Sequence, residues 1–240
     1  MNLISKFEVL HRRTKQNRWM GYFTVFNRVS LAAGFLPSGY VKIVGERFTD
    51  LHNNHPMGHY LEALHMTGYY YTFIGIMQVT AALFLLVPRT ATLGVLIYFP
   101  IILNICVLSH SVCFIGSLVS SPLMVLSCIY LLCWDYDKLK YILPLKHKTA
   151  YETMPGGEKL SNRFPVVFFA ASFAAVVGLA ISISNAYDIE PFNTLPDCQA
   201  QCPEASNTEA CETFCDCIHN QGKPYHVCRD AYQKSLTNNK

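Results

Sequence analysis

Long runs without a charged side chain constrain this chain of 240 residues more than any other feature. Apolar residues make up 51% of the chain and charged residues only 15%, against roughly a quarter charged in average soluble proteins. Several runs reach the length of about 20 residues that a helix needs to cross a bilayer core of about 30 Å. The sequence therefore predicts a helical membrane protein. It excludes an ordinary soluble enzyme, a nucleic-acid-binding domain and a disordered chain.

Five apolar spans are predicted from this pattern. Each should be helical, because lipid offers no partner to a free backbone N–H or C=O group. Pro100 and Pro122 lie inside the third and fourth spans, where they should kink the helix or leave it partly unwound. The spans cover residues 19–41, 67–87, 90–108, 112–134 and 164–184.

The distribution of Lys and Arg predicts the orientation of these spans. Five spans place the N-terminal segment, the turn at Arg89 and residues 135–163 on one side, with five, one and six basic residues. The segments on the other side carry two, none and four. Because cytoplasmic loops are rich in basic residues, we expect a cytoplasmic N-terminus and an exported C-terminal tail. The N-terminal segment fits two interpretations, a short amphipathic helix on an anionic membrane face or a solvated basic tail.

Six of the ten cysteines lie in the last 43 residues. An even number in a segment with little apolar content indicates an exported module stapled by disulfides. A Cys-x3-Cys pair puts both sulfurs on one helix face, so two bridges can staple facing helices. A third bridge could close the turn between the last two helices. The six are Cys198, Cys202, Cys211, Cys215, Cys217 and Cys228, and their spacing leaves the pairing open.

Two other chemistries fit these cysteines. Zinc accepts this spacing, with His219 and His226 as further ligands, and a redox-active pair is the second alternative. An exported position argues against reduced thiolates, and the Cys-x-x-Cys spacing of thiol oxidoreductases is absent. We therefore expect structural disulfides and no metal.

Four histidines lie in the loop between the first two spans, residues 42–66. His55 and His59 fall on one helix face if Pro56 begins a helix, and with Asp50 or Glu62 they would form a metal site. Packing at the membrane interface is the competing interpretation. Ligand or proton handling is a third possibility for the last of the four, His65.

Arg28 is a full charge inside a predicted span. Such a residue costs several kcal/mol in lipid and therefore usually faces the bundle interior with a partner. The expected partners are Gln78, Asn104 or a tyrosine of residues 69–71, and a structural hydrogen-bond hub competes with a functional role. Asp135 is expected just outside the membrane, within an aromatic anchor that ends the fourth span.

Nucleotide-binding, serine-hydrolase and zinc-protease motifs are absent from the sequence, and so is a facing histidine pair suited to haem. Three segments resemble the DoxX-like family of membrane proteins. Arg28 followed by residues 35–42 is similar to the first-span motif of that family, which ends in Lys. Residues 67–88 resemble its second span, and residues 132–139 resemble the end of its fourth.

The resemblance covers about residues 20–143 and implies a four-helix membrane domain in a bacterial inner membrane. The family includes subunits of a thiosulfate:quinone oxidoreductase. The resemblance also implies that Arg28, Gly39, Lys42 and Gln78 lie in the interior that is conserved in the family. Many members carry Glu where this chain has Gln78, and Gln cannot exchange a proton.

The expected fold is thus an all-α polytopic membrane protein with five parts. They are a cytoplasmic basic segment (1–18), the four-helix DoxX-like domain (19–143), a cytoplasmic linker (144–163), a fifth membrane helix (164–187) and an exported cysteine-rich module in the periplasm (188–240).

Two classes of function fit this layout. The first is an accessory or anchor subunit of a redox-associated membrane complex, which would contact lipid and bind protein partners through the exported module. After Ser184 the chain has eight acidic and four basic residues, which suits a basic partner. The second is a quinone-binding membrane subunit of an oxidoreductase, with transport of a small molecule as a remaining possibility. The candidate ligand residues are Arg28, Lys42, His65, Gln78 and Asn104.

Overall fold

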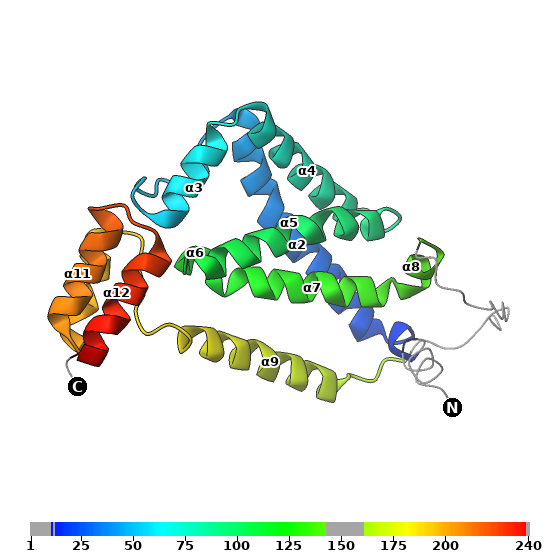
Figure 1. The fold of residues 1–240 in the computed structure, drawn as a ribbon. Helices are drawn as coiled ribbons and strands as arrows, with labels where there is room; N and C mark the ends of the chain where they lie inside the picture. The colour runs from blue at the N-terminus through cyan, green and yellow to red at the C-terminus, as the bar shows by residue number, and fades with distance from the viewer. Residues whose placement is uncertain (1–10, 12, 143–160, 239–240) are drawn as a thin grey trace.

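The computed structural model describes residue 11 and residues 13–142 and 161–238, and the regular elements of these residues are helices (Figure 1). Most of the predicted basic segment and of the predicted linker lies outside the described residues. The helices of the N-terminal part are α2 (Arg18–Val44), α3 (Pro56–His65), α4 (Tyr69–Leu86), α5 (Ala91–Ser111), α6 (Ile115–Leu118), α7 (Ser120–Trp134) and α8 (Tyr136–Ile142). Those of the C-terminal part are α9 (Val166–Ser184), α10 (Leu195–Ala200), the 3-10 helix η1 (Cys202–Glu204), α11 (Thr208–His219) and α12 (Tyr225–Asn238).

Within the described residues, four helical segments are long and apolar enough to cross a membrane: α4, α5, the segment Ile115–Trp134 formed by α6 and α7, and α9. The predicted first span is also helical, as part of α2, but α2 carries Arg28 and is not among these four. Length and composition thus support four of the five predicted spans.

The third and fourth spans differ in detail from the prediction. Helix α5 continues through Pro100 to Ser111, and the chain then turns at Cys113, whose φ is 51°. The fourth span is divided at Val119 into α6 and α7, and Pro122 lies in the first turn of α7. A proline is tolerated there because the first N–H groups of a helix have no intrahelical partner.

Helices α2, α4, α5 and α7 form a closed four-helix arrangement, in which α2 packs against α4 and α7, and α5 packs against the same two helices. Two glycines set the closest approach of α2 and α4. A Cβ on Gly39 would lie 2.8 Å from the carbonyl oxygen of Gly75, and a Cβ on Gly75 would lie 2.7 Å from that of Gly39. The two backbones therefore touch at this crossing.

The core of the bundle is filled by aliphatic side chains around one aromatic pair. Phe35 of α2 stacks on Tyr98 of α5, and the Tyr98 hydroxyl donates a hydrogen bond to the Leu31 carbonyl at 3.0 Å. The remaining members of this buried cluster are Ala32, Ala81, Ala82, Leu85, Val95, Ile102, Cys128 and Leu131.

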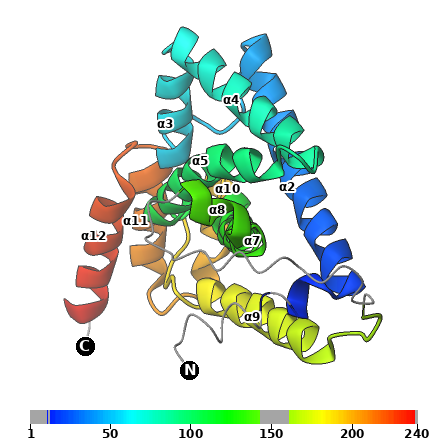
Figure 2. The same ribbon diagram turned by 90° about the vertical axis from the view of Figure 1, so that its right-hand side faces the viewer.

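Segments predicted to share one side of the membrane lie together at one end of the bundle (Figures 1 and 2). Asn17, before α2, pairs with Ser161, before α9. Lys15 donates to Asp137 of α8 at 2.7 Å, and Trp19 packs against Phe164. Helices α3, α6 and the C-terminal module lie toward the other end (Figure 1).

Helix α9 runs between these two ends. Near its start, Phe168 and Phe169 pack edge-on against Phe23 of α2. Much of its surface is nevertheless exposed: Val167, in the first turn, is 83% exposed, and Phe173 is 73% exposed. An apolar helix with so much open surface is suited to a lipid environment.

The C-terminal module packs directly on the end of the bundle. Cys113 and Leu118, from the α5–α6 corner, belong to the same buried cluster as Phe214 and Ile218 of α11 and Tyr225 of α12. Tyr187 adds a hydrogen bond from its hydroxyl to the His110 carbonyl at 3.1 Å. The module and the bundle therefore share one core at this end.

Candidate functional site

Arg28 is paired with Asp135. The distance from Arg28 Nη2 to Asp135 Oδ2 is 3.6 Å, and the two side chains are 13% and 7% exposed. Asp135 also accepts a hydrogen bond from Thr92 Oγ1 at 2.7 Å and lies 3.3 Å from Lys138 Nζ. The predicted partners of Arg28 were wrong, because its counter-charge is Asp135, which is buried beside α2.

Lys42 and Gln78 are brought together by Ser38, one turn before Lys42 on α2. Lys42 Nζ donates to the Ser38 carbonyl at 2.9 Å and to Ser38 Oγ at 2.8 Å. Ser38 Oγ in turn donates to Gln78 Oε1 at 3.3 Å. Lys42 Nζ also lies 4.3 Å from the centroid of the Phe48 ring. Both Lys42 and Gln78 are buried, so this chain of contacts replaces the water they give up.

His65 lies beside this group and Asn104 does not. His65 Nε2 is 3.0 Å from the Gly45 carbonyl oxygen, and its ring meets that of Tyr71, which also faces Lys42. Asn104 is exposed on α5. Arg28 is 14 residues before Lys42 on α2, which is about 20 Å along the helix. The five predicted ligand residues therefore occupy three places and do not form one site.

The six C-terminal cysteines form three disulfides. Cys198–Cys215 and Cys202–Cys211 staple the α10–η1 segment to α11, and Cys217–Cys228 closes the turn between α11 and α12. The prediction of structural disulfides and of two bridges between facing helices is confirmed. Asn207 caps α11 by accepting a hydrogen bond from Ala210 N, and α12 begins at Tyr225.

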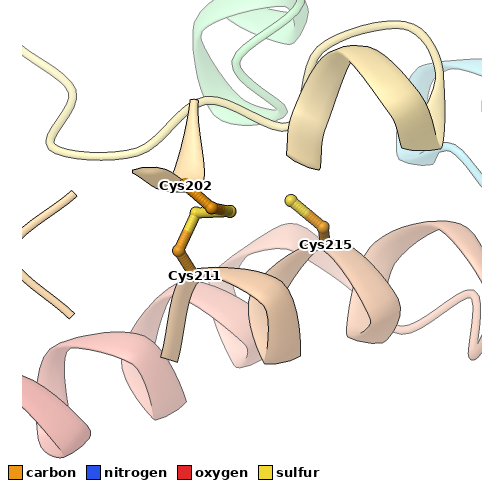
Figure 3. A group of neighbouring side chains, drawn as sticks. All are labelled: Cys202, Cys211 and Cys215. Carbon is orange, nitrogen blue, oxygen red and sulfur yellow. A yellow bond between two sulfur atoms is a disulfide. The ribbon is translucent and has the colours of Figure 1, made fainter. Parts of the chain in front are cut away.

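Two of these disulfides lie side by side. Figure 3 shows Cys215 beside the Cys202–Cys211 bridge, and the three sulfur atoms lie within 4.8 Å of one another. In the described part of the chain, these three sulfurs are the group of potential metal ligands that lie close enough together to share one ion. All three are bonded in disulfides. His219 is engaged elsewhere, with Nε2 2.7 Å from the Pro191 carbonyl oxygen.

A helix does begin at Pro56, as α3, and His55 caps it. His55 Nδ1 accepts a hydrogen bond from Met57 N at 3.1 Å. The His55 ring lies 6.0 Å from that of His219 in α11, centroid to centroid, and 6.3 Å from that of Phe114. Burial, with the neighbouring His219 as a second cause, lowers the pKa of His55 to about 4. The imidazole is therefore neutral at physiological pH.

This contact joins the loop between α2 and α3 to the cysteine-rich module. Next to His55, Asn54 Nδ2 donates to the His219 carbonyl at 2.8 Å. We call the contact of Asn54 and His55 with His219 the loop–module seam. Sequence reasoning did not find it, because nothing local in the loop or in the tail indicates that the two meet.

Fold and site together define a helical membrane protein whose bundle carries a disulfide-stapled module at one end. No family model matches the chain, and no solved structure matches it. It is similar to the uncharacterized protein YwoB of Bacillus subtilis (strain 168), with 43% identity over 70 residues, 29% of this chain and 44% of YwoB. The chain thus spans less than half the length of that relative. The DoxX-like resemblance stays a prediction.

Proposed function

We propose that this chain is a non-catalytic accessory or anchor subunit of a membrane complex and that its exported module is the docking part. One observation carries the proposal. The polar groups inside the bundle bind each other: Arg28 pairs with Asp135, and Lys42 bonds to Ser38 and through it to Gln78. Groups paired in this way have little capacity left for a ligand, although Arg28 Nε is buried without a hydrogen-bond partner in the described part of the chain.

The packing of α2 on α4 supports the same conclusion. A quinone site between these two helices would need a cleft that opens between them. Their crossing at Gly39 and Gly75 leaves no room even for a Cβ, and the nearby interior holds the stacked rings of Phe35 and Tyr98. A flat ring system would have to displace this packing.

The proposed topology has α2 as a fifth membrane helix, with the N-terminus in the cytoplasm of a bacterial cell and the module in the periplasm. Helix α2 has 27 residues, which is about 40 Å of helix and enough to cross a bilayer. Asp135 lowers the cost of holding Arg28 in lipid, because a paired charge is less unfavourable there than a free one. The DoxX-like resemblance favours a redox-associated complex.

The test is purification of the tagged full chain from its own membrane in mild detergent, followed by mass spectrometry of proteins and lipophilic small molecules. We expect a stoichiometric protein partner and no stoichiometric quinone. The matched variant Cys202→Ser with Cys211→Ser should lose the partner while the bundle stays folded. A stoichiometric quinone that disappears in Arg28→Ala, with no protein partner, would instead make the chain a ligand-binding redox subunit.

A further inference from the structure

A pocket of about 590 Å³ lies at the junction between the bundle and the module. Three parts of the chain form it: the loop between α2 and α3 at residues 49–52, Phe114 at the α5–α6 corner, and the module at residues 193–195 and 219–220. The loop–module seam borders it, because His219 belongs to both. The cavity therefore exists only while the module is docked on the bundle.

Carboxylates dominate the charge around this pocket. Asp50 lines it, is exposed, and has no hydrogen bond or ion pair with the described part of the chain. Two further carboxylates are bonded to lining residues: Asp197 accepts a hydrogen bond from Thr194 at 2.6 Å, and Asp216 accepts one from Asn220 at 2.7 Å.

Among the described residues, two cations lie near the pocket, Arg47 and Lys223. Arg47 Nη2 donates to the carbonyl of the lining residue Leu51 at 2.6 Å, and Arg47 Nη1 is paired with Glu62 at 3.2 Å. His52 and His219 contribute imidazoles to the lining.

Asp216 accepts hydrogen bonds from Asn220 and Gln221, and these bonds lower the pKa of its carboxyl group. The nearby charge of Lys223 lowers the same pKa by a smaller amount. Asp216 therefore stays ionised at neutral pH. The chain after Ser184 is also negatively charged overall, like the surroundings of the pocket.

The pocket also has apolar walls. Leu51, Phe114 and Leu195 line it alongside the polar groups. A long basic side chain needs this combination, because its methylene stem packs on apolar surface while its charged end reaches a carboxylate. An aromatic ring such as Phe114 adds a face that attracts a cation.

We propose that this pocket seats a Lys or Arg side chain from a basic segment of an exported partner protein, with Asp50 as the counter-charge. The proposal rests on the proposed docking function and names the place and chemistry of the contact. Asp50 binds the ammonium or guanidinium group, and Phe114 and Leu195 cover the stem.

The test uses the full chain in lipid nanodiscs and a fluorescein-labelled ten-residue peptide of alternating Gly and Lys, with fluorescence anisotropy as the readout. A Gly–Glu peptide of the same length is the charge control. Asp50→Asn should weaken binding of the Lys peptide about fivefold or more, the scale expected for a lost interfacial charge pair. Asn193→Arg, which puts a cation in the pocket, should weaken it further. Glu212→Gln removes one carboxylate from α11 outside the pocket and should leave binding within about twofold.

Several results would overturn the inference. These are equal weakening by Asp50→Asn and Glu212→Gln, no preference for the Lys peptide, or full co-purification of the native partner with both pocket variants. The last result would leave the docking function standing and move the contact elsewhere. If the wild-type chain captures no protein partner at all, the proposed function fails and this inference fails with it.

Discussion

Arg28 and Asp135 join the first helix of the bundle to the end of α7 through a buried ion pair, with 3.6 Å between Nη2 and Oδ2. Each side chain depends on the other, because a lone charge inside a bundle is costly. Asp135 binds three groups at once, since Thr92 on α5 and Lys138 on α8 also contact its carboxylate. One carboxylate therefore ties together four helices near one end of the bundle.

The variant Asp135→Asn should destabilise the bundle by about 3 kcal/mol, because it leaves Arg28 buried without a counter-charge. Thermal unfolding in detergent measures the effect. Asp137→Asn is the matched control: Asp137 also forms an ion pair, with Lys15, but its side chain is 46% exposed. A half-exposed pair contributes at most about 1 kcal/mol. Equal losses of stability in the two variants would show that the buried pair with Arg28 contributes no more than the half-exposed pair with Lys15.

The variant Gly75→Ala should cost about 1–3 kcal/mol, because its Cβ would press on the Gly39 carbonyl and push α2 away from α4. Gly178→Ala, in the exposed middle of α9, is the control, since a Cβ there meets nothing within 4 Å. This second change should be neutral or stabilising by up to about 1 kcal/mol through helix propensity. A neutral Gly75→Ala would mean that α2 and α4 do not touch at this crossing.

Features fixed by nearby residues could be predicted from the sequence. The Cys-x3-Cys spacing predicted the two disulfides that staple facing helices, and hydropathy predicted the four apolar spans that the structure supports. The Arg28–Asp135 pair was missed, because sequence gives the depth of a residue in a span and not which helices adjoin. The loop–module seam at His55 and His219 was missed for the same reason.

The variant Cys198→Ser should produce mispaired disulfides, because it frees the Cys215 thiol beside the Cys202–Cys211 bridge. The sulfurs of these three cysteines lie within 4.8 Å, and a thiolate exchanges with a disulfide that it can reach. We expect a mixture of Cys202–Cys211, Cys202–Cys215 and Cys211–Cys215 in peptide mapping without reduction. Cys217→Ser is the control, since it frees Cys228, which is not part of this close group. A single native pairing in Cys198→Ser would contradict the prediction.

Acidification should open the loop–module seam, because His55 is buried and neutral there. The pKa of His55 is about 4 in the folded chain and about 6.5 when it is unfolded. The stability that it contributes is therefore complete above pH 6.5 and is lost as the pH falls toward 4, with a loss of roughly 2 kcal/mol at pH 5.

Hydrogen exchange of the full chain in nanodiscs between pH 7.5 and 5, corrected for the intrinsic pH dependence of exchange, measures this opening. Protection should fall at the start of α3 and in α11, while α4 and α5 keep theirs. The groups that face His55 are His219, Phe114 and the backbone of Phe192, whose hydrogen bond raises the pKa of His55 against the larger effect of burial. His219→Gln therefore tests the share of the second imidazole. His55→Asn keeps an acceptor suited to capping Met57 N and removes the titration, and it should abolish most of the pH response. An unchanged response in His55→Asn would assign the opening to another group.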